Sequence, residues 1–253
     1  FSKLSRDDIK REFGLDGVDL SVALADGLDS GMAELGERMK EYTENASHEI
    51  QTPLAIISTK LEQLLQCKDL PLKQTQIIAD AYNASNRLAR LNQTLILLTR
   101  IENMQFPEVA AVVPQQIIED HLENYEELIL SKEIKLSCFY EPNVTLLINP
   151  YLSDILFLNL IKNAIRHNLP QGELKIHLDQ KGFEILNSGK PPVGDTSKIF
   201  NRFYKSTDSS KSIGLGLAIV KKIAEIFQLQ IEYSYQENLH RFYIQFPPKK
   251  EIS

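Results

Sequence analysis

Three polar side chains lie within about one helical turn of each other in the run HEIQTPL, residues 48–54. A neutral imidazole, here that of His48, is a good nucleophile near pH 7, and a neighbouring carboxylate such as Glu49 can hold the proton on its second ring nitrogen. Thr52 lies four residues after His48, on the same helix face, where its hydroxyl could position a water molecule. The usual explanation for a lone histidine is a solvated surface residue, and these neighbours argue against it.

Pro53 lies inside the same expected helix, five residues after His48. A proline there leaves the carbonyl of Glu49 without its helical partner, at a cost of about 3 kcal/mol. We therefore expect a bent, softened helix beside the histidine.

A second polar cluster lies in NLIKNAIRHN, residues 159–168. Asn159 and Asn163 are one helical turn apart, and Arg166 and His167 continue the same face. Amide oxygens suit a hard cation such as Mg²⁺, and arginine suits phosphate. A solvent-exposed helix face would explain two asparagines equally well.

A third candidate site is the glycine-containing run GLGLAIVKK, residues 214–222. Gly214 and Gly216 precede an expected helix whose first amides could bind a phosphate. The run is neither a P-loop nor a dinucleotide fingerprint, and a plain helix start is the alternative. Upstream lies a polar loop with Arg202, Lys205 and Lys211, which begins at two aromatic residues, Phe200 and Phe203. These two would also be explained as core aromatics of a short helix.

Two long helices must position His48. Apolar or small residues recur at steps of three and four in two series, which predicts two helices of about 30 residues joined near CKDLPL. The first series is Leu35, Met39, Tyr42, Ala46, Ile50, Pro53, Ile57, Leu61 and Leu64, and the second is Ile77, Ala81, Ala84, Leu88, Leu91, Leu95 and Leu98. A two-helix hairpin encloses little core, so we expect a homodimeric four-helix bundle.

Residues 106–253 have a different, mixed pattern. Strands are expected in EVAAVV, IKLSCFY, VTLLIN, ELKIHLDQKGFEILNSG and LQIEYSYQENLHRFYIQF, and helices in PQQIIEDHLENYEELILSK, PYLSDILFLNLIKNAIRHN and LGLAIVKKIAEIFQ. The expected fold class is α+β, in which a helical hairpin of residues 32–105 is followed by a two-layer α/β sandwich of residues 106–253. Residues 1–31 are expected to be a linker, a sensor remnant or an added segment.

Composition limits the possible partners. The net charge of −6 argues against broad nucleic-acid binding. No run approaches 18 apolar residues, so this fragment is not expected to contact a membrane directly. Because the chain opens on Phe1, we expect a piece of a longer protein that could carry a membrane anchor upstream. Cys67 and Cys138 fit no metal spacing and indicate ordinary thiols.

The run HEIQTPL resembles, residue for residue, the phosphoacceptor box of sensor histidine kinases, and residues 33–248 carry that family's further boxes in order. The resemblance implies that His48 is phosphorylated, Glu49 is the general base and Thr52 supports phosphatase action on a partner. It also implies that ATP and Mg²⁺ bind in the second domain, whose fold is that of the gyrase, heat-shock chaperone and histidine-kinase ATPases. The residues it assigns to this site are Asn159 and Asn163 (Mg²⁺ ligands), Arg166, His167, Asn187, Gly189, Phe203, Lys205, Gly214, Leu215, Gly216 and Leu217.

One box departs from the family pattern. The family has Asp-x-Gly-x-Gly, whose aspartate accepts a hydrogen bond from adenine, and the matching stretch here is NSGKP. Asn187 replaces the aspartate, Gly189 is kept and Pro191 replaces the second glycine. A neutral acceptor predicts roughly tenfold weaker nucleotide binding.

The resemblance implies a sensor kinase core that autophosphorylates His48 and passes the phosphoryl group to an aspartate of a response regulator. It also implies the cytoplasmic portion of a bacterial inner-membrane sensor protein. Two alternatives stay open, a pseudokinase or dimeric scaffold that binds nucleotide weakly, and an ATPase that acts independently of His48.

Overall fold

The computed structural model describes residues 49–67, 70–204 and 214–248. The predicted phosphoacceptor His48, the predicted ligand contact Lys205 and the segment 1–31 lie outside these ranges. The chain divides into two compact units, Phe1–Tyr82 and Asn83–Ser253. Each unit is described separately below.

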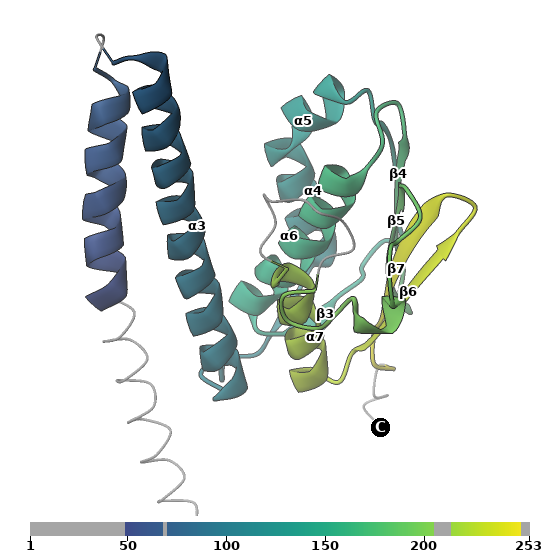
Figure 1. Cartoon of the computed structure of the whole chain (residues 1–253). Coiled ribbons are helices and arrows are strands. Elements are labelled where there is room, and N and C mark those ends of the chain that lie inside the picture. Colours follow the sequence, from purple (N-terminus) through teal and green to yellow (C-terminus); the bar gives the residue numbers. More distant parts are fainter. Residues whose placement is uncertain (1–48, 68–69, 205–213, 249–253) are drawn as a thin grey trace, which may run out of the picture. The chain divides into compact units, whose positions relative to one another are not determined.

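The first unit contains one helix of a hairpin and the beginning of the second, whose remainder belongs to the second unit (Figure 1). Residues 49–65 are helical on both sides of Pro53, and α3 (Leu72–Glu102) begins after a short connection. Leu54 is buried, whereas the predicted seam residues Ile50, Ile57 and Ile77 are 44%, 48% and 60% exposed. A single hairpin therefore leaves most of this apolar seam uncovered.

The second unit is built on a mixed five-stranded sheet in the order β2-β4-β5-β7-β6. Strand β2 pairs in parallel with β4, and the other neighbours are antiparallel. A separate antiparallel pair joins β1 to β3. The strands are β1 (Ala110–Val112), β2 (Lys135–Tyr140), β3 (Leu146–Ile148), β4 (Glu173–Leu178), β5 (Gly182–Ser188), β6 (Gln230–Gln236) and β7 (Leu239–Gln245).

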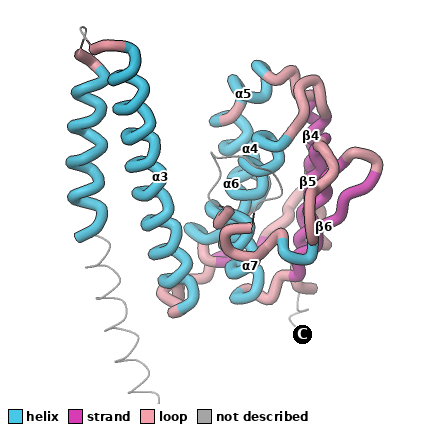
Figure 2. The backbone as a smooth tube through the Cα atoms, viewed as in Figure 1, coloured by secondary structure: helices cyan, strands magenta, loops and turns pink. Residues whose placement is uncertain are grey.

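Helices cover one face of this sheet, as Figure 2 shows. They are α4 (Pro114–Asn124), α5 (Glu126–Ser131), α6 (Pro150–His167) and α7 (Gly216–Ile226). The core lies between the two layers. There the rings of Phe157 on α6 and Phe183 on β5 pack edge to face, with their centroids 5.0 Å apart. Leu98 and Ile101, near the end of α3, are buried in the same core. The predicted helical hairpin followed by a two-layer α/β sandwich is thus confirmed.

One local prediction is wrong, and one alternative explanation fits only in part. The single helix expected over PQQIIEDHLENYEELILSK is broken at Tyr125, whose φ of −108° and ψ of 10° are not helical. The break allows Ile118 before it and Ile129 after it to reach the same core. The alternative explanation of Phe200 and Phe203 as core aromatics does not hold for Phe203, which is 53% exposed. Phe200 does pack against the core. Its ring lies edge to face with the ring of Phe242, and the two centroids are 6.3 Å apart.

No helix in the described ranges combines the length and apolarity needed to cross a membrane.

Candidate nucleotide-binding site

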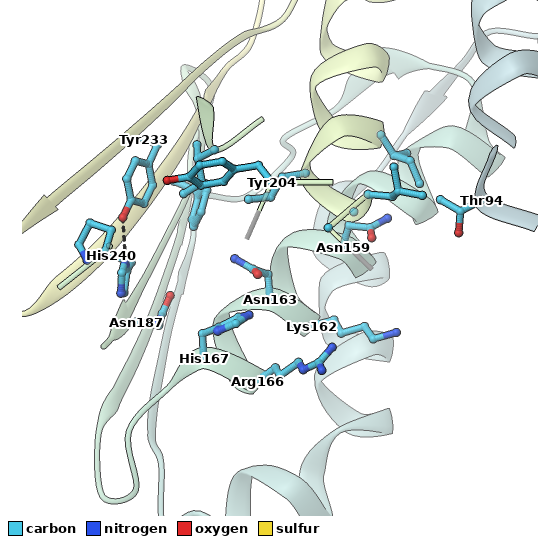
Figure 3. Close-up of a pocket in the computed structure, with 18 of the residues that line it drawn as sticks. Thr94, Asn159, Lys162, Asn163, Arg166, His167, Asn187, Tyr204, Tyr233 and His240 are labelled. Carbon is cyan, nitrogen blue, oxygen red and sulfur yellow. Dashed lines mark hydrogen bonds between the residues drawn. The ribbon is translucent and has the colours of Figure 1, made fainter. Parts of the chain in front are cut away.

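Helix α6 positions most of the predicted polar side chains. Pro150 is its first residue, and the side chain of Asn149 caps it by accepting from the backbone N–H of Leu152 at 3.0 Å. One face of α6 is buried in the core through residues such as Leu156 and Leu160. Asn159, Asn163, Arg166 and His167 lie along the C-terminal half of the helix (Figure 3).

These four side chains line a cavity of about 570 Å³. The start of α7, the end of β5 and the β6–β7 hairpin supply much of the remaining wall, and Arg90, Gln93 and Thr94 come from the part of α3 that belongs to this unit. The cavity has two chemically different ends. One is cationic, with Lys162 and Arg166, and the other is aromatic, with Tyr233, His240 and Phe242. A nucleotide carries the same two features, a polyanion and a planar ring.

Gly214 shapes the cavity wall at the start of α7. Its φ is +78°, and a Cβ there would lie 2.7 Å from the carbonyl oxygen of Tyr204. Only glycine combines this backbone conformation with so close an approach. Helix α7 starts two residues later, so its free N-terminal amides lie at the cavity wall, where helix geometry favours an anion.

Two amide side chains are oriented by the backbone of their own elements. Asn159 donates from Nδ2 to the carbonyl of Ile155 at 2.8 Å, which leaves Oδ1 as an acceptor. Asn187 is 1% exposed and donates from Nδ2 to the carbonyl of Ser188 at 3.0 Å, so its Oδ1 is likewise the remaining acceptor. Both therefore offer oxygen atoms, which can act as ligands of a hard cation or as hydrogen-bond acceptors for an amino group.

The electrostatics of the cavity favour an anion. Among the described residues that line it, none is Asp or Glu, whereas Arg90, Lys162, Arg166 and Lys190 are basic. Burial and the neighbouring Arg166 lower the pKa of His167 below its usual 6.5. Burial also lowers the pKa of His240. Both imidazoles are consequently neutral at physiological pH, and the fixed positive charge comes from lysine and arginine.

The cavity brings together nine of the predicted site residues, namely Asn159, Asn163, Arg166, His167, Asn187, Gly214, Leu215, Gly216 and Leu217. Gly189 and Phe203 are not among the residues that line it. Gly189 instead packs against the ring of His240. Phe203 lies in a turn and has a φ of +64°. Glu49 and Thr52 belong to the first unit, and both are exposed there.

Sequence reasoning missed the aromatic end of the cavity. Tyr233 on β6 and both His240 and Phe242 on β7 were assigned only to a closing hairpin. Their alternation would have placed them on one face of the sheet. Which face that is depends on strand pairing, which sets His240 directly opposite Asn187. The sequence carries no signal of that pairing.

The layered fold, the glycine-lined helix start and the acid-free cavity define a nucleotide-binding ATPase domain that follows a helical hairpin. Family models agree with this description in both parts of the chain. Residues 38–103 match the His Kinase A (phospho-acceptor) domain, and residues 153–250 match the histidine kinase-, DNA gyrase B- and HSP90-like ATPase.

Known proteins resemble the chain over most of its length. The heme sensor protein HssS of Staphylococcus aureus is 31% identical over 212 residues, which is 80% of this chain and 45% of HssS. The structure of full-length ShkA in complex with AMPPNP covers 82% of this chain and 45% of its own, at 20% identity with a TM-score of 0.64. The Acinetobacter baumannii histidine kinase AdeS covers 80% of this chain and 98% of its own, at 20% identity with a TM-score of 0.56. These two structures show the shared fold.

The chain belongs to the sensor histidine kinases of two-component systems. It spans about half the length of the curated relatives it matches.

Proposed function

We propose that ATP binds in the cavity of the second unit and donates its γ-phosphoryl group to a ring nitrogen of His48. The observation that carries this proposal is the two-ended cavity, with Lys162 and Arg166 at one end, aromatic rings at the other, helix amides in its wall and no acidic residue among its described lining. The reaction needs little covalent chemistry from the protein, so its contribution is positioning and charge neutralisation.

Within the cavity, Arg166 and the amides at the start of α7 would hold the phosphates. Asn163, assisted by Asn159, would hold Mg²⁺ through amide oxygens, and the ion would supply neutralisation of phosphate charge. The described residues contain no group of three or more His, Cys, Asp or Glu side chains that could hold a metal. An ion here therefore needs nucleotide phosphates and water as its other ligands. His167, neutral because of its lowered pKa, lies where it can contact the nucleotide without adding charge.

In the first unit, Glu49 would accept the proton that His48 loses and Thr52 would position water for the reverse, phosphatase reaction on the partner. The phosphoryl group would pass to an aspartate of a response-regulator receiver domain. The uncovered seam of the hairpin, with Ile50, Ile57 and Ile77 all more than 40% exposed, supports a homodimer through a four-helix bundle. The chain would be the cytoplasmic portion of a membrane-anchored bacterial sensor.

One feature favours a second candidate, a dimeric scaffold that binds nucleotide poorly. Asn187 and Pro191 stand where the family has Asp and Gly, and a neutral acceptor forms a weaker hydrogen bond than a carboxylate.

The deciding experiment is incubation of the full chain with labelled ATP and Mg²⁺, followed by assay for acid-labile, alkali-stable phosphate. His48→Ala removes the proposed acceptor, and His177→Ala, a partly exposed histidine on β4, is the matched control. Label on the wild type and on the control but not on His48→Ala supports the kinase. Equal label on His48→Ala contradicts it, and absent label despite nucleotide binding supports the scaffold. Steady ATP hydrolysis that persists in His48→Ala would indicate an independent ATPase.

A further inference from the structure

The aromatic end of the cavity contains a hydrogen-bonded chain that the proposed function does not use. The imidazole of His240 lies at its centre, with Nε2 3.0 Å from the carbonyl oxygen of Lys190 and Nδ1 2.8 Å from the hydroxyl of Tyr233 (Figure 3). Tyr235 donates from its hydroxyl to the carbonyl of Gly189 at 3.2 Å. Two strands, β6 and β7, are thereby tied to one short segment, residues 189–190.

The acceptor at Lys190 fixes the state of the ring. A backbone carbonyl can only accept, so Nε2 must carry the proton. In a neutral imidazole Nδ1 is then bare, and the Tyr233 hydroxyl must donate to it. The geometry therefore specifies one tautomer, a neutral ring protonated at Nε2.

Gly189 is matched to this ring. A Cβ at position 189 would lie 2.2 Å from Cδ2 and 2.3 Å from Nε2 of His240, so any larger residue would displace the imidazole. The family resemblance marks this glycine as part of a ligand loop, yet here it does not line the cavity. Its role in this chain is to make room for the histidine.

The segment that His240 holds forms part of the cavity rim. Lys190, Pro191 and Pro192 all line the cavity and lie beyond the last paired residue of β5, Ser188. Pro191 and Pro192 have no amide hydrogen with which to pair to a neighbouring strand. Three hydrogen bonds therefore fix this rim to the sheet. Tyr235 and His240 bind the carbonyls of Gly189 and Lys190, and the amide of Gly189 donates to the carbonyl of Asn238 at 2.9 Å.

We propose that His240 is a positioning residue, which holds the 189–192 rim against the sheet and so sets the end of the cavity that receives the uncharged ring of a nucleotide. The proposal rests on the proposed nucleotide site and deepens it. It assigns recognition of the ring to a hydrogen-bonded wall of Tyr233 and His240, while the phosphates are held at the opposite, basic end of the cavity.

Two kinds of ligand separate this role from a general structural one. A fluorescent ADP analogue uses both ends of the cavity, whereas inorganic tripolyphosphate, measured by its competition with that analogue, uses only the basic end. His240→Phe keeps a ring but loses both nitrogens, and Tyr233→Phe loses one donor. We expect affinity for the ADP analogue to fall about tenfold in the first variant and about threefold in the second, with tripolyphosphate affinity unchanged in both.

The matched control is Tyr243→Phe, on the same strand, whose hydroxyl bonds the carbonyl of Lys181 rather than the cavity rim. It should bind both ligands as the wild type does. Equal losses for both ligands in His240→Phe, or no loss for either, would overturn the positioning role. If the wild type binds neither ligand, the proposed nucleotide site itself fails, which is a distinguishable result.

A measurement on the unmodified chain tests the geometry without any variant. Nitrogen-15 NMR of the imidazoles distinguishes the two neutral tautomers. We expect His240 to be protonated at Nε2 near pH 7.5 and to remain so in Tyr233→Phe, because the carbonyl of Lys190 still requires the proton at Nε2. A wild-type His240 protonated at Nδ1 would refute the hydrogen-bond chain.

Discussion

Lys132, immediately after α5, caps the end of α6 at which Arg166 and His167 enter the cavity. Its Nζ donates to the carbonyls of Ile165 and Arg166, at 2.9 Å each, and to that of Asn168 at 3.3 Å. The last carbonyls of a helix have no partner within it, so the ammonium satisfies groups that would otherwise depend on water. Lys132→Met keeps the length and apolar stem of the side chain and removes the three donors.

The size of the effect follows from two opposing contributions. A hydrogen bond that involves a charged group contributes about 1.5–3 kcal/mol, and two of the three are at short distance. Against this, partial burial and the nearby Arg166 lower the pKa of Lys132, which shows that the ammonium loses hydration and is repelled in the folded state. Water can also reach some of the freed carbonyls in the variant. We expect a net loss of about 2–3 kcal/mol in the free energy of unfolding.

Urea unfolding followed by circular dichroism measures this loss, because the chain has no tryptophan to report by fluorescence. With an m-value of about 1–3 kcal/mol/M, the midpoint should fall by about 0.7–3 M. Hydrogen exchange should show lost protection confined at first to the last turn of α6, near residues 165–168. Since that turn carries Arg166 and His167, affinity for the ADP analogue should fall as well, about three- to tenfold.

Lys181→Met, at an exposed lysine in the β4–β5 turn, is the control. It should change neither the midpoint nor the exchange pattern. A Lys132→Met variant that unfolds within about 0.5 kcal/mol of the wild type, with full protection at the end of α6, would refute the capping argument.

Three further predictions concern the cavity. Gly214→Ala should weaken nucleotide binding and lower stability by about 1–2 kcal/mol, because φ of +78° and the nearby Tyr204 carbonyl exclude a Cβ; wild-type affinity by titration would contradict this. Stability should be full above about pH 6.5 and decline as pH falls through the lowered pKa values of His167 and His240, since the unfolded chain binds these protons more readily. Urea midpoints between about pH 5 and 7.5 test this, and His240→Phe should flatten the decline. Asn187→Asp should lose about 1–3 kcal/mol of stability, measured by thermal unfolding, without a tenfold gain in nucleotide affinity.

The sequence predicted those parts of the site that one element supplies by itself. Asn159, Asn163, Arg166 and His167 share a face because helical periodicity requires it, and Gly214 precedes a helix start that the sequence displays directly. The same local reasoning gave the α/β layering, since long apolar series and alternating strands are visible in sequence.

The parts that depend on pairing between distant segments were not predictable. Tyr233 and His240 reach the cavity only because β7 pairs with both β5 and β6, and no local pattern specifies that order. The break at Tyr125 has a similar origin. Local propensity favours one continuous helix there, and contacts of Ile118 and Ile129 with the core override it.

Asn187 illustrates how the surroundings of a residue change the meaning of a substitution. From sequence, the loss of a carboxylate predicts weaker nucleotide binding that a return to aspartate would restore. In the structure Asn187 is 1% exposed, and its amide donates to the carbonyl of Ser188. An aspartate at position 187 would place a second acceptor against the Ser188 carbonyl. It would also bury a negative charge, and among the described residues no donor forms a hydrogen bond to this side chain. Asparagine keeps one acceptor oxygen for a ligand and satisfies the backbone with its other end. The neutral asparagine is therefore suited to this strand end. Its weaker hydrogen bond to a nucleotide has to be weighed against the loss of stability that a buried aspartate would cause.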